Sequence, residues 1–331
     1  MKLMEKQITG VTFCAMLFAL CFPVQAQQPA KIPRVGFLLF PSRSAIAEPL
    51  DAFRQGMREL GYVEGQNIAI EYRYADGKFD RLPHLAGELV RSQVDVIVAG
   101  GGLSAIRSAK NATSTIPIVM TGTADPVASG LILSLARPGG NVTGPTMGDR
   151  ELAGKRLELL KETVPKVSRV AVLLSGTSPT MSLSINEIKT TARALGLQIQ
   201  SVEVRSADDL EGAFQTIVQG RSHALAVDPS PVFTSNRKQI LAFAANNRLP
   251  AMYPWREYVE DGGLMSYAAK LSDLYRRAAT YVSKILKGAK PSDLPVEQPT
   301  KFEFIINLKT AKQIGLTIPA NVLLRADKVI K

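Results

Sequence analysis

Short apolar runs alternate with amphipathic stretches along the first half of this 331-residue chain. The runs, which have the length and composition of strands, are residues 34–40, 68–74, 94–99 and 116–120. The stretches between them, which carry apolar residues at helical spacing, are residues 47–60, 79–91 and 103–112. Strands that alternate with helices in this way predict a parallel sheet with helices on both faces.

The alternation begins again after a Gly- and Pro-rich segment at 137–144. The strand-like runs of this second series are residues 169–174, 224–227 and 250–253, and its helical stretches are residues 150–164, 181–195 and 210–217. Ser206 and Asp209 have the spacing of a capping box before the last of these helices. Both series open with Arg-Val-x-x-Leu-Leu, at Arg34 and Arg169. The sequence predicts an α/β fold of two doubly wound parallel-sheet lobes, whose strands end along a shared cleft where ligands bind.

The last part of the chain predicts how the two lobes are joined. Residues 262–267 resemble a strand that returns to the first lobe, 274–285 a helix, 302–306 a strand and 323–330 a short helix. We expect crossover hinge strands near 142–144 and 264–267. The expected organisation is a signal peptide at 1–26, lobe 1 at 27–144, lobe 2 at 145–263, a return to lobe 1 at 264–306, and a C-terminal tail at 307–331 on lobe 2.

The first 26 residues have the pattern of a secretory signal peptide. Lys2 and Lys6 precede an apolar run at 11–22, and the segment ends in Val24-Gln25-Ala26. The run is too short to cross a bilayer comfortably, which disfavours the alternatives of a transmembrane anchor or a buried N-terminal helix. We therefore expect export to the periplasm, with cleavage after Ala26.

Both cysteines, Cys14 and Cys21, lie inside this segment. Cleavage would leave a protein without disulfides, thiolate chemistry or cysteine-ligated metals. Lipidation of Cys21 is disfavoured because the bulky Leu20 precedes it, where a small residue is expected.

The chain is basic, with a net charge of +11 that falls to +10 when Lys2, Lys6 and Glu5 are removed. The basic residues are scattered, and the few aromatic residues are not interleaved with them. These features disfavour a nucleic-acid partner. They are typical of a cationic surface with some attraction to anionic ligands or membrane faces.

One glycine-rich loop has an enzyme-like pattern. Residues 100–105 read Gly-Gly-Gly-Leu-Ser-Ala and fit a loose G-x-G-x-x-A between a strand and a helix. A dinucleotide site is disfavoured because its fingerprint belongs to the first strand-to-helix turn, and this is the third. Gly101, Gly102 and Ser104 instead favour a helix N-terminus that holds an anion or carboxylate. A tight turn without a ligand is the alternative.

Polar groups follow other expected strands in both series. Thr121, Thr123 and Asp125 come after the fourth strand, and Asp228 follows a strand of the second series. Asp125 suits either a ligand ammonium or the cap of a helix that starts at Pro126. The first loop of each series adds the ligand candidates Ser42, Ser44 and Thr177. An aromatic loop adds Tyr253 and Trp255, which could equally serve packing.

Groups that could support catalysis are scarce. His84 and His223 are far apart in the chain, and no nucleophile elbow, zinc-protease pair or phosphate-binding lysine motif is present. The pair Asp208 and Asp209 suits the charge at a helix N-terminus. We expect a protein that binds rather than transforms its ligand, with no catalytic residue, metal or cofactor.

Seven further segments carry a family resemblance. They are residues 53–67 (FRQGMRELGYVEGQN), 115–119 (TIPIV) with the following Asp125-Pro126-Val127, 137–144 (RPGGNVTG), 155–160 (KRLELL), 255–257 (WRE), 262–267 (GGLMSY) and 302–307 (FEFIIN). In this order they resemble the type I periplasmic substrate-binding proteins of ABC transporters, in the branch that includes tryptophan- and phenylalanine-binding members. The resemblance covers essentially the whole chain after the signal peptide.

This resemblance implies a two-lobed protein that closes on a small solute and presents it to an ABC permease in the inner membrane. It implies that the ligand lies at the 101–104 loop, the 121–125 loop and Asp228. The chain departs from the aromatic-amino-acid binders, which carry a Thr-Pro-Thr-type loop at 101–104 and lack the 255–257 segment. Asp125 and Asp228 suit an amino-acid-like zwitterion, which we favour. They also suit a polyhydroxylated or nucleoside-like solute.

Two other functions are compatible with these patterns. The first is a periplasmic sensory subunit that reports its ligand to a membrane sensor kinase, with the same fold and a different partner. The second is an exported α/β enzyme, which the missing nucleophile–base set disfavours. We expect a monomer with a small-molecule solute as its ligand.

The exported protein should begin at Gln27, because Ala26 is the small residue that ends the signal pattern. N-terminal sequencing of the exported protein checks this expectation. A retained Met1, or a chain that starts at a lipidated Cys21, would contradict it.

Overall fold

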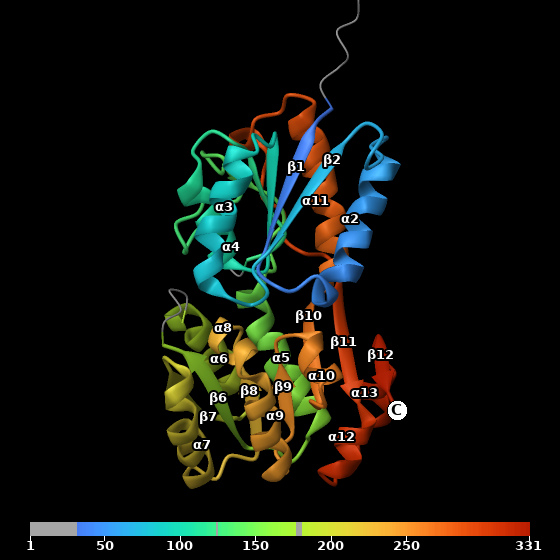
Figure 1. Ribbon diagram of the computed structural model, residues 1–331. Helices are drawn as coiled ribbons and strands as arrows, with labels where there is room; N and C mark the ends of the chain where they lie inside the picture. The colour runs from blue at the N-terminus through green and yellow to red at the C-terminus, as the bar shows by residue number, and fades with distance from the viewer. Residues whose placement is uncertain (1–31, 124, 177–180) are drawn as a thin grey trace, which may run out of the picture. The chain divides into compact units, whose positions relative to one another are not determined.

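The computed structural model describes residues 32–123, 125–176 and 181–331 (Figure 1). The expected signal peptide, its cysteines and the candidate Thr177 lie outside these residues. Among the described residues, no helix is long and apolar enough to span a membrane.

The first sheet consists of five parallel strands in the order β2-β1-β3-β4-β5. They are β1 (Arg34–Leu39), β2 (Ala69–Tyr74), β3 (Val96–Gly100), β4 (Ile118–Met120) and β5 (Val142–Thr143). The helices around it are α2 (Ala47–Glu59), α3 (Leu82–Arg91), α4 (Leu103–Ala112) and α11 (Leu271–Leu286), with short 3-10 turns at Ser44–Ile46, Phe79–Arg81 and Pro291–Asp293. The strand Val-Ile-Val-Ala-Gly of β3 is buried throughout, as a strand covered on both faces must be.

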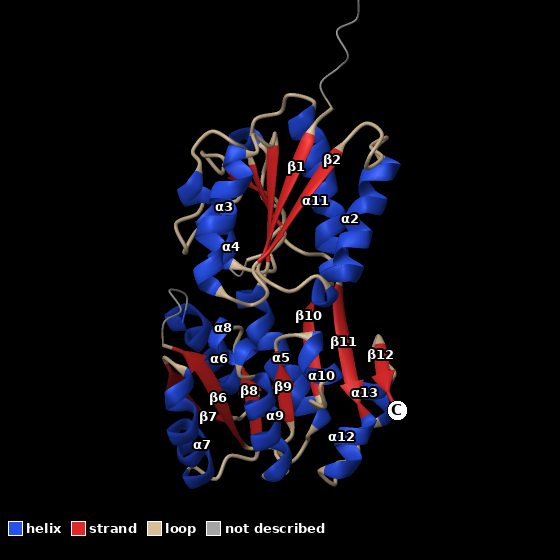
Figure 2. Cartoon of the chain, in the orientation of Figure 1, coloured by secondary structure: helices blue, strands red, loops and turns tan. Residues whose placement is uncertain are grey.

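Two apolar cores lie on opposite faces of this sheet. Alternate residues of β3 serve the two cores: Val96 and Val98 pack with α2 and α11, and Ile97 and Ala99 pack with α3 and α4. Figure 2 shows the same division, with α3 and α4 on one side of the red strands and α2 and α11 on the other.

The second sheet has seven strands in the order β12-β11-β10-β9-β8-β6-β7. They are β6 (Arg169–Ser175), β7 (Gln198–Val204), β8 (Ala224–Val227), β9 (Ala251–Tyr253), β10 (Met265–Ala269), β11 (Phe302–Asn307) and β12 (Lys328–Ile330). Only the β10–β11 pairing is antiparallel. Its helices are α5 (Asp149–Thr163), α6 (Met181–Ala194), α7 (Leu210–Gln219), α8 (Pro231–Ser235), α9 (Arg237–Asn246), α10 (Arg256–Glu260), α12 (Leu308–Gln313) and α13 (Ala320–Leu323), with a 3-10 turn at Ala207–Asp209.

The two doubly wound lobes predicted from the sequence are confirmed, and so is the capping box of Ser206 and Asp209. The structure differs in the last third of the chain. Residues 264–306 were expected to return to the first lobe, but β10 pairs with β9, and β11 pairs with β10, in the second sheet. Helix α11 packs against the first sheet, because its apolar side chains join the core shared with α2, and Leu294 and Val296 after it also contact the first-lobe cores.

The C-terminal tail also differs from the expected helix at 323–330. Helix α13 ends at Leu323, and residues 328–330 form the edge strand β12 beside β11. Asp327 explains the change, because its backbone N–H donates to Phe304 O and its side chain accepts from Phe304 N, at 2.9 and 2.8 Å. The backbone bonds of a strand partner thus replace those of a continued helix.

The chain passes between the two sheets three times, at residues 144–148, at residue 270 and at 294–301. These passages touch one another: Thr146 N donates to Glu297 O at 2.8 Å, and Lys270 N donates to Lys301 O at 3.0 Å. Asp273 and Lys301 add an ion pair at 3.1 Å. We name these three segments the crossover segments.

Arg156, on α5, is a charged side chain that is only 4% exposed. Its Nε donates to Tyr267 O at 2.8 Å, and its Nη2 lies 3.5 Å from Pro254 O. These two carbonyls belong to β10 and to the residue after β9. Arg156 therefore ties α5 to two neighbouring strands of the second sheet.

Replacing Arg156 with Met should lower the free energy of unfolding by about 2–4 kcal/mol, because buried carbonyls lose a charged donor. Urea denaturation measures the change. The control is Arg205→Met, since the Arg205 ion pair with Glu203 lies at the surface and contributes about 0–1 kcal/mol. Equal effects of the two substitutions would show that the buried contacts of Arg156 do not stabilise the second lobe.

Candidate functional site

The ends of β1, β3 and β4 lie next to one another at the carboxyl edge of the first sheet. Phe40 N donates to Gly100 O at 3.0 Å, and Thr121 N donates to Ala99 O at 3.1 Å. The loops that follow these strands therefore start side by side. The structure brings together most first-lobe candidates here, as expected for parallel strands.

The glycine loop is shaped by close contact with the end of β1. Gly101 and Gly102 have φ angles of +94° and +97°, which side-chain-bearing residues rarely adopt. A Cβ on Gly101 would lie 2.6 Å from the Cβ of Phe40. Gly102 is the N-cap of α4 without a side-chain cap, and Ser104 is a half-buried residue of the first turn. The first backbone N–H groups of α4 therefore have no side-chain cap, and no acidic residue lies in the first turn of the helix.

The first loop supplies hydroxyls and an aromatic face. The hydroxyls of Ser42 and Ser44 lie 3.2 Å apart, and Ser44 is exposed. Phe40 and Phe79 stack with ring centroids 4.3 Å apart, and Phe79 is 41% exposed. Sequence reasoning missed this pair, because the two residues belong to different elements and neither has a distinctive neighbour in the chain.

Asp125 caps a turn in the structure. Its Oδ1 accepts from Val127 N at 3.1 Å and from Ala128 N at 2.9 Å. The following residues form a turn rather than the helix considered from the sequence. The carboxylate is half-buried, so the capping role is compatible with a ligand contact at the same group.

Thr121 and Thr123, in the loop after β4, are buried, with 1% and 3% of their surface exposed. The Thr121 hydroxyl has a long contact of 3.4 Å to Ala99 O. Both threonines therefore lie at the buried base of the site.

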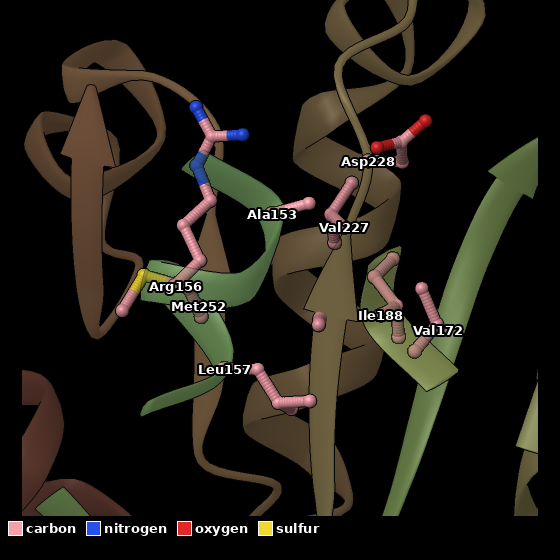
Figure 3. Close-up of a pocket in the computed structure, with 9 residues that line it drawn as sticks. Ala153, Arg156, Leu157, Val172, Ile188, Val227, Asp228 and Met252 are labelled. Atoms are coloured by element: carbon pink, nitrogen blue, oxygen red, sulfur yellow. The ribbon is translucent and has the colours of Figure 1, made fainter. Parts of the chain in front are cut away.

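In the second lobe, Asp228 follows β8 and is 8% exposed. It borders a cavity of ≈ 20 Å³ whose lining also includes Arg156, Val227 and Met252. Figure 3 shows the polar ends of Arg156 and Asp228 directed the same way, away from Leu157. The cavity has room for about one water molecule and is too small for an amino acid.

Tyr253 and Trp255 do not form a common aromatic wall. Tyr253 is 1% exposed and stacks on Tyr258 in the core, with ring centroids 5.0 Å apart. Burial raises the pKa of Tyr253 well above its ordinary value. Trp255 is half-buried against the same core and precedes α10. In this structure Tyr253 therefore serves packing, and Trp255 keeps a partly accessible ring.

The site offers hydrogen-bond donors and carboxylates rather than a metal centre. Within the described residues, no three His, Cys, Asp or Glu side chains are grouped so that they could hold a metal ion. The first-lobe candidates share one sheet edge, and Asp228 lies at the equivalent edge of the second sheet. This arrangement suits binding of a small polar molecule.

Known proteins match this chain over most of its length. A tyrosine-binding protein of Clostridioides difficile is 27% identical over 264 residues, which are 80% of this chain and 75% of that protein. A Streptococcus pneumoniae ABC domain solved with L-Trp is 26% identical, with a TM-score of 0.80 over 90% of this chain and 99% of that one. A leucine-binding protein of Thermotoga maritima shares the fold at 13% identity, with a TM-score of 0.59 over 86% and 87% of the two chains.

The family model described as "ABC transporter substrate binding protein" matches residues 34–330, which include every strand of both sheets. The two lobes have the fold of the type I periplasmic binding proteins. The chain belongs to the ABC transporter substrate-binding protein family.

Proposed function

We propose that this protein is the periplasmic solute-binding subunit of an ABC importer. Its solute is a small polar molecule of the amino-acid class, and its partner is a permease of the inner membrane. The observation that carries the proposal is the family match from residue 34 to 330 on two parallel sheets joined by crossover segments. One relative named a tyrosine-binding protein and another solved in complex with L-Trp make aromatic amino acids the first candidates.

The groups at the two carboxyl edges fit such a solute. The uncapped start of α4 suits a carboxylate, since N–H groups and the helix dipole both favour a negative charge there. Asp125 and Asp228 suit the ammonium group. The exposed ring of Phe79, stacked on Phe40, offers an apolar contact for the side chain of the solute.

Binding works by closure of the two lobes about the crossover segments. Three adjacent chain passages allow rotation of one lobe against the other while both sheets keep their hydrogen bonds. Closure brings carboxylates of both lobes to one solute and excludes water from it. The solute leaves chemically unchanged, because the described groups at the site bind charge and apolar surface and include no nucleophile paired with a base.

Aromatic amino acids should stabilise the folded protein. A solute that binds only the folded state adds about 2.7 kcal/mol when its concentration is about 100 times Kd. Thermal unfolding with L-tyrosine, L-tryptophan and L-phenylalanine measures the effect, with L-glutamate as a control of different charge. Mass spectrometry of molecules released from the purified protein identifies the solute independently. Stabilisation by a sugar or nucleoside instead would contradict the amino-acid assignment, and recovery of a chemically altered solute would contradict pure binding.

Asp125→Asn should weaken binding of an aromatic amino acid by about 2–4 kcal/mol, because the ammonium loses its charged partner. Asn keeps the oxygen that caps the turn, so the fold is preserved. Calorimetry should show a smaller effect on 3-phenylpropanoate, which has no ammonium group. Asp125→Ala separates the two roles, because it also removes the cap. Unchanged affinity in a folded Asp125→Asn protein would limit Asp125 to capping.

A further inference from the structure

Tyr275, on α11, is fully buried, and its hydroxyl lies at the carboxyl edge of the first sheet. A Cβ placed on Gly100 would lie 2.1 Å from this hydroxyl and 3.0 Å from the Thr121 hydroxyl. Gly100 therefore leaves the space that the two hydroxyls occupy. The pair lies where the loops after β3 and β4 begin.

The hydroxyl of Tyr275 faces that of Thr121 but makes no hydrogen bond of normal geometry among the described residues. Burial raises its pKa, so it stays protonated and remains a donor at neutral pH. A buried hydroxyl without a good partner is costly and uncommon in folded proteins. Packing alone would be served better by Phe at this position.

The neighbouring hydroxyl of Thr121 also makes poor hydrogen bonds. Beside the Tyr275 hydroxyl, the Thr121 hydroxyl has among the described residues one contact, to Ala99 O at 3.4 Å, which is beyond the usual range for a hydroxyl donor. A Thr121 side chain that accepts from Tyr275 can direct its own proton towards the site. The two hydroxyls then form a chain that ends in a donor, which recognises an acceptor oxygen on the solute.

We propose that Tyr275 is a positioning residue for the solute: its hydroxyl orients Thr121 so that Thr121 donates to the solute carboxylate. This assignment rests on the proposed binding function and adds a specificity-determining residue to it. The hydroxyls acquire good hydrogen bonds only with the solute in place. The site thereby prefers solutes that present a carboxylate at the edge of the first sheet.

The test is Tyr275→Phe, with Tyr281→Phe as the matched control on the same helix. The Tyr281 hydroxyl donates to Pro295 O at 2.6 Å, so its removal should lower the melting temperature by roughly 2–4 °C without changing affinity. Tyr275→Phe should leave the melting temperature of the unliganded protein unchanged or raise it. The same substitution should weaken binding of L-tryptophan or L-tyrosine by about 10- to 100-fold in calorimetry.

Two further measurements separate positioning from a structural effect. Tryptamine, which has neither oxygen of the carboxylate, should bind wild type and Tyr275→Phe equally. Thr121→Val should weaken L-tryptophan binding, and adding Tyr275→Phe to it should cause little further loss, because the two hydroxyls act in one chain. Additive losses would overturn the inference.

The outcomes distinguish this inference from the proposed function. If wild type binds L-tryptophan or L-tyrosine and Tyr275→Phe binds it equally, the inference is wrong and the function stands. If Tyr275→Phe destabilises the unliganded protein as much as Tyr281→Phe does, the hydroxyl serves the fold and the inference is wrong. If wild type binds no amino acid in a panel that includes L-phenylalanine and L-leucine, the proposed solute class and the carboxylate assignment both fail.

Discussion

The packing of α11 against α2 and the first sheet is the interaction on which the rest of the structure depends. The strands before and after α11 belong to the second sheet, so burying α11 in the first core makes the chain cross twice between the sheets. With the passage after β5, these crossings form the three crossover segments. The same helix places the Tyr275 hydroxyl beside Gly100 and Thr121. One buried helix thus links the first core, the connection between lobes and the candidate site.

The parallel order of the strands explains where the polar groups gather. Loops after parallel strands emerge at one edge, so residues far apart in sequence, such as Ser44, Ser104 and Asp125, lie at the same edge of the first sheet. The second lobe also has a buried tyrosine hydroxyl near its carboxyl edge, comparable to that of Tyr275. There the buried hydroxyl of Tyr258 faces Thr234, again without a hydrogen bond of normal geometry among the described residues. Each sheet therefore keeps a buried tyrosine hydroxyl near the loops that would face the solute.

Periodicity and turn signals were enough to predict the two doubly wound lobes and the capping box at Ser206, but not strand β7 or helix α9 of the second lobe. They could not assign 264–306, because an apolar run identifies a strand but not the strand with which it pairs. The tail strand at Lys328–Ile330 depends on the bonds between Asp327 and Phe304, which have no local sequence signal. For the site, the strand ends were predictable and the exposure of each side chain was not. Tyr253 is buried by stacking on Tyr258, and the place of Tyr275 depends on a missing side chain at Gly100.

The central claim is that this chain closes two lobes on its solute, and small-angle X-ray scattering tests it most directly. The protein is unfolded and refolded to remove bound molecules, and its radius of gyration is then measured alone and with the solute identified by mass spectrometry. Closure about the crossover segments predicts a smaller radius with the solute present at saturation. The same radius in both states, with binding verified by calorimetry on the same sample, would contradict the account.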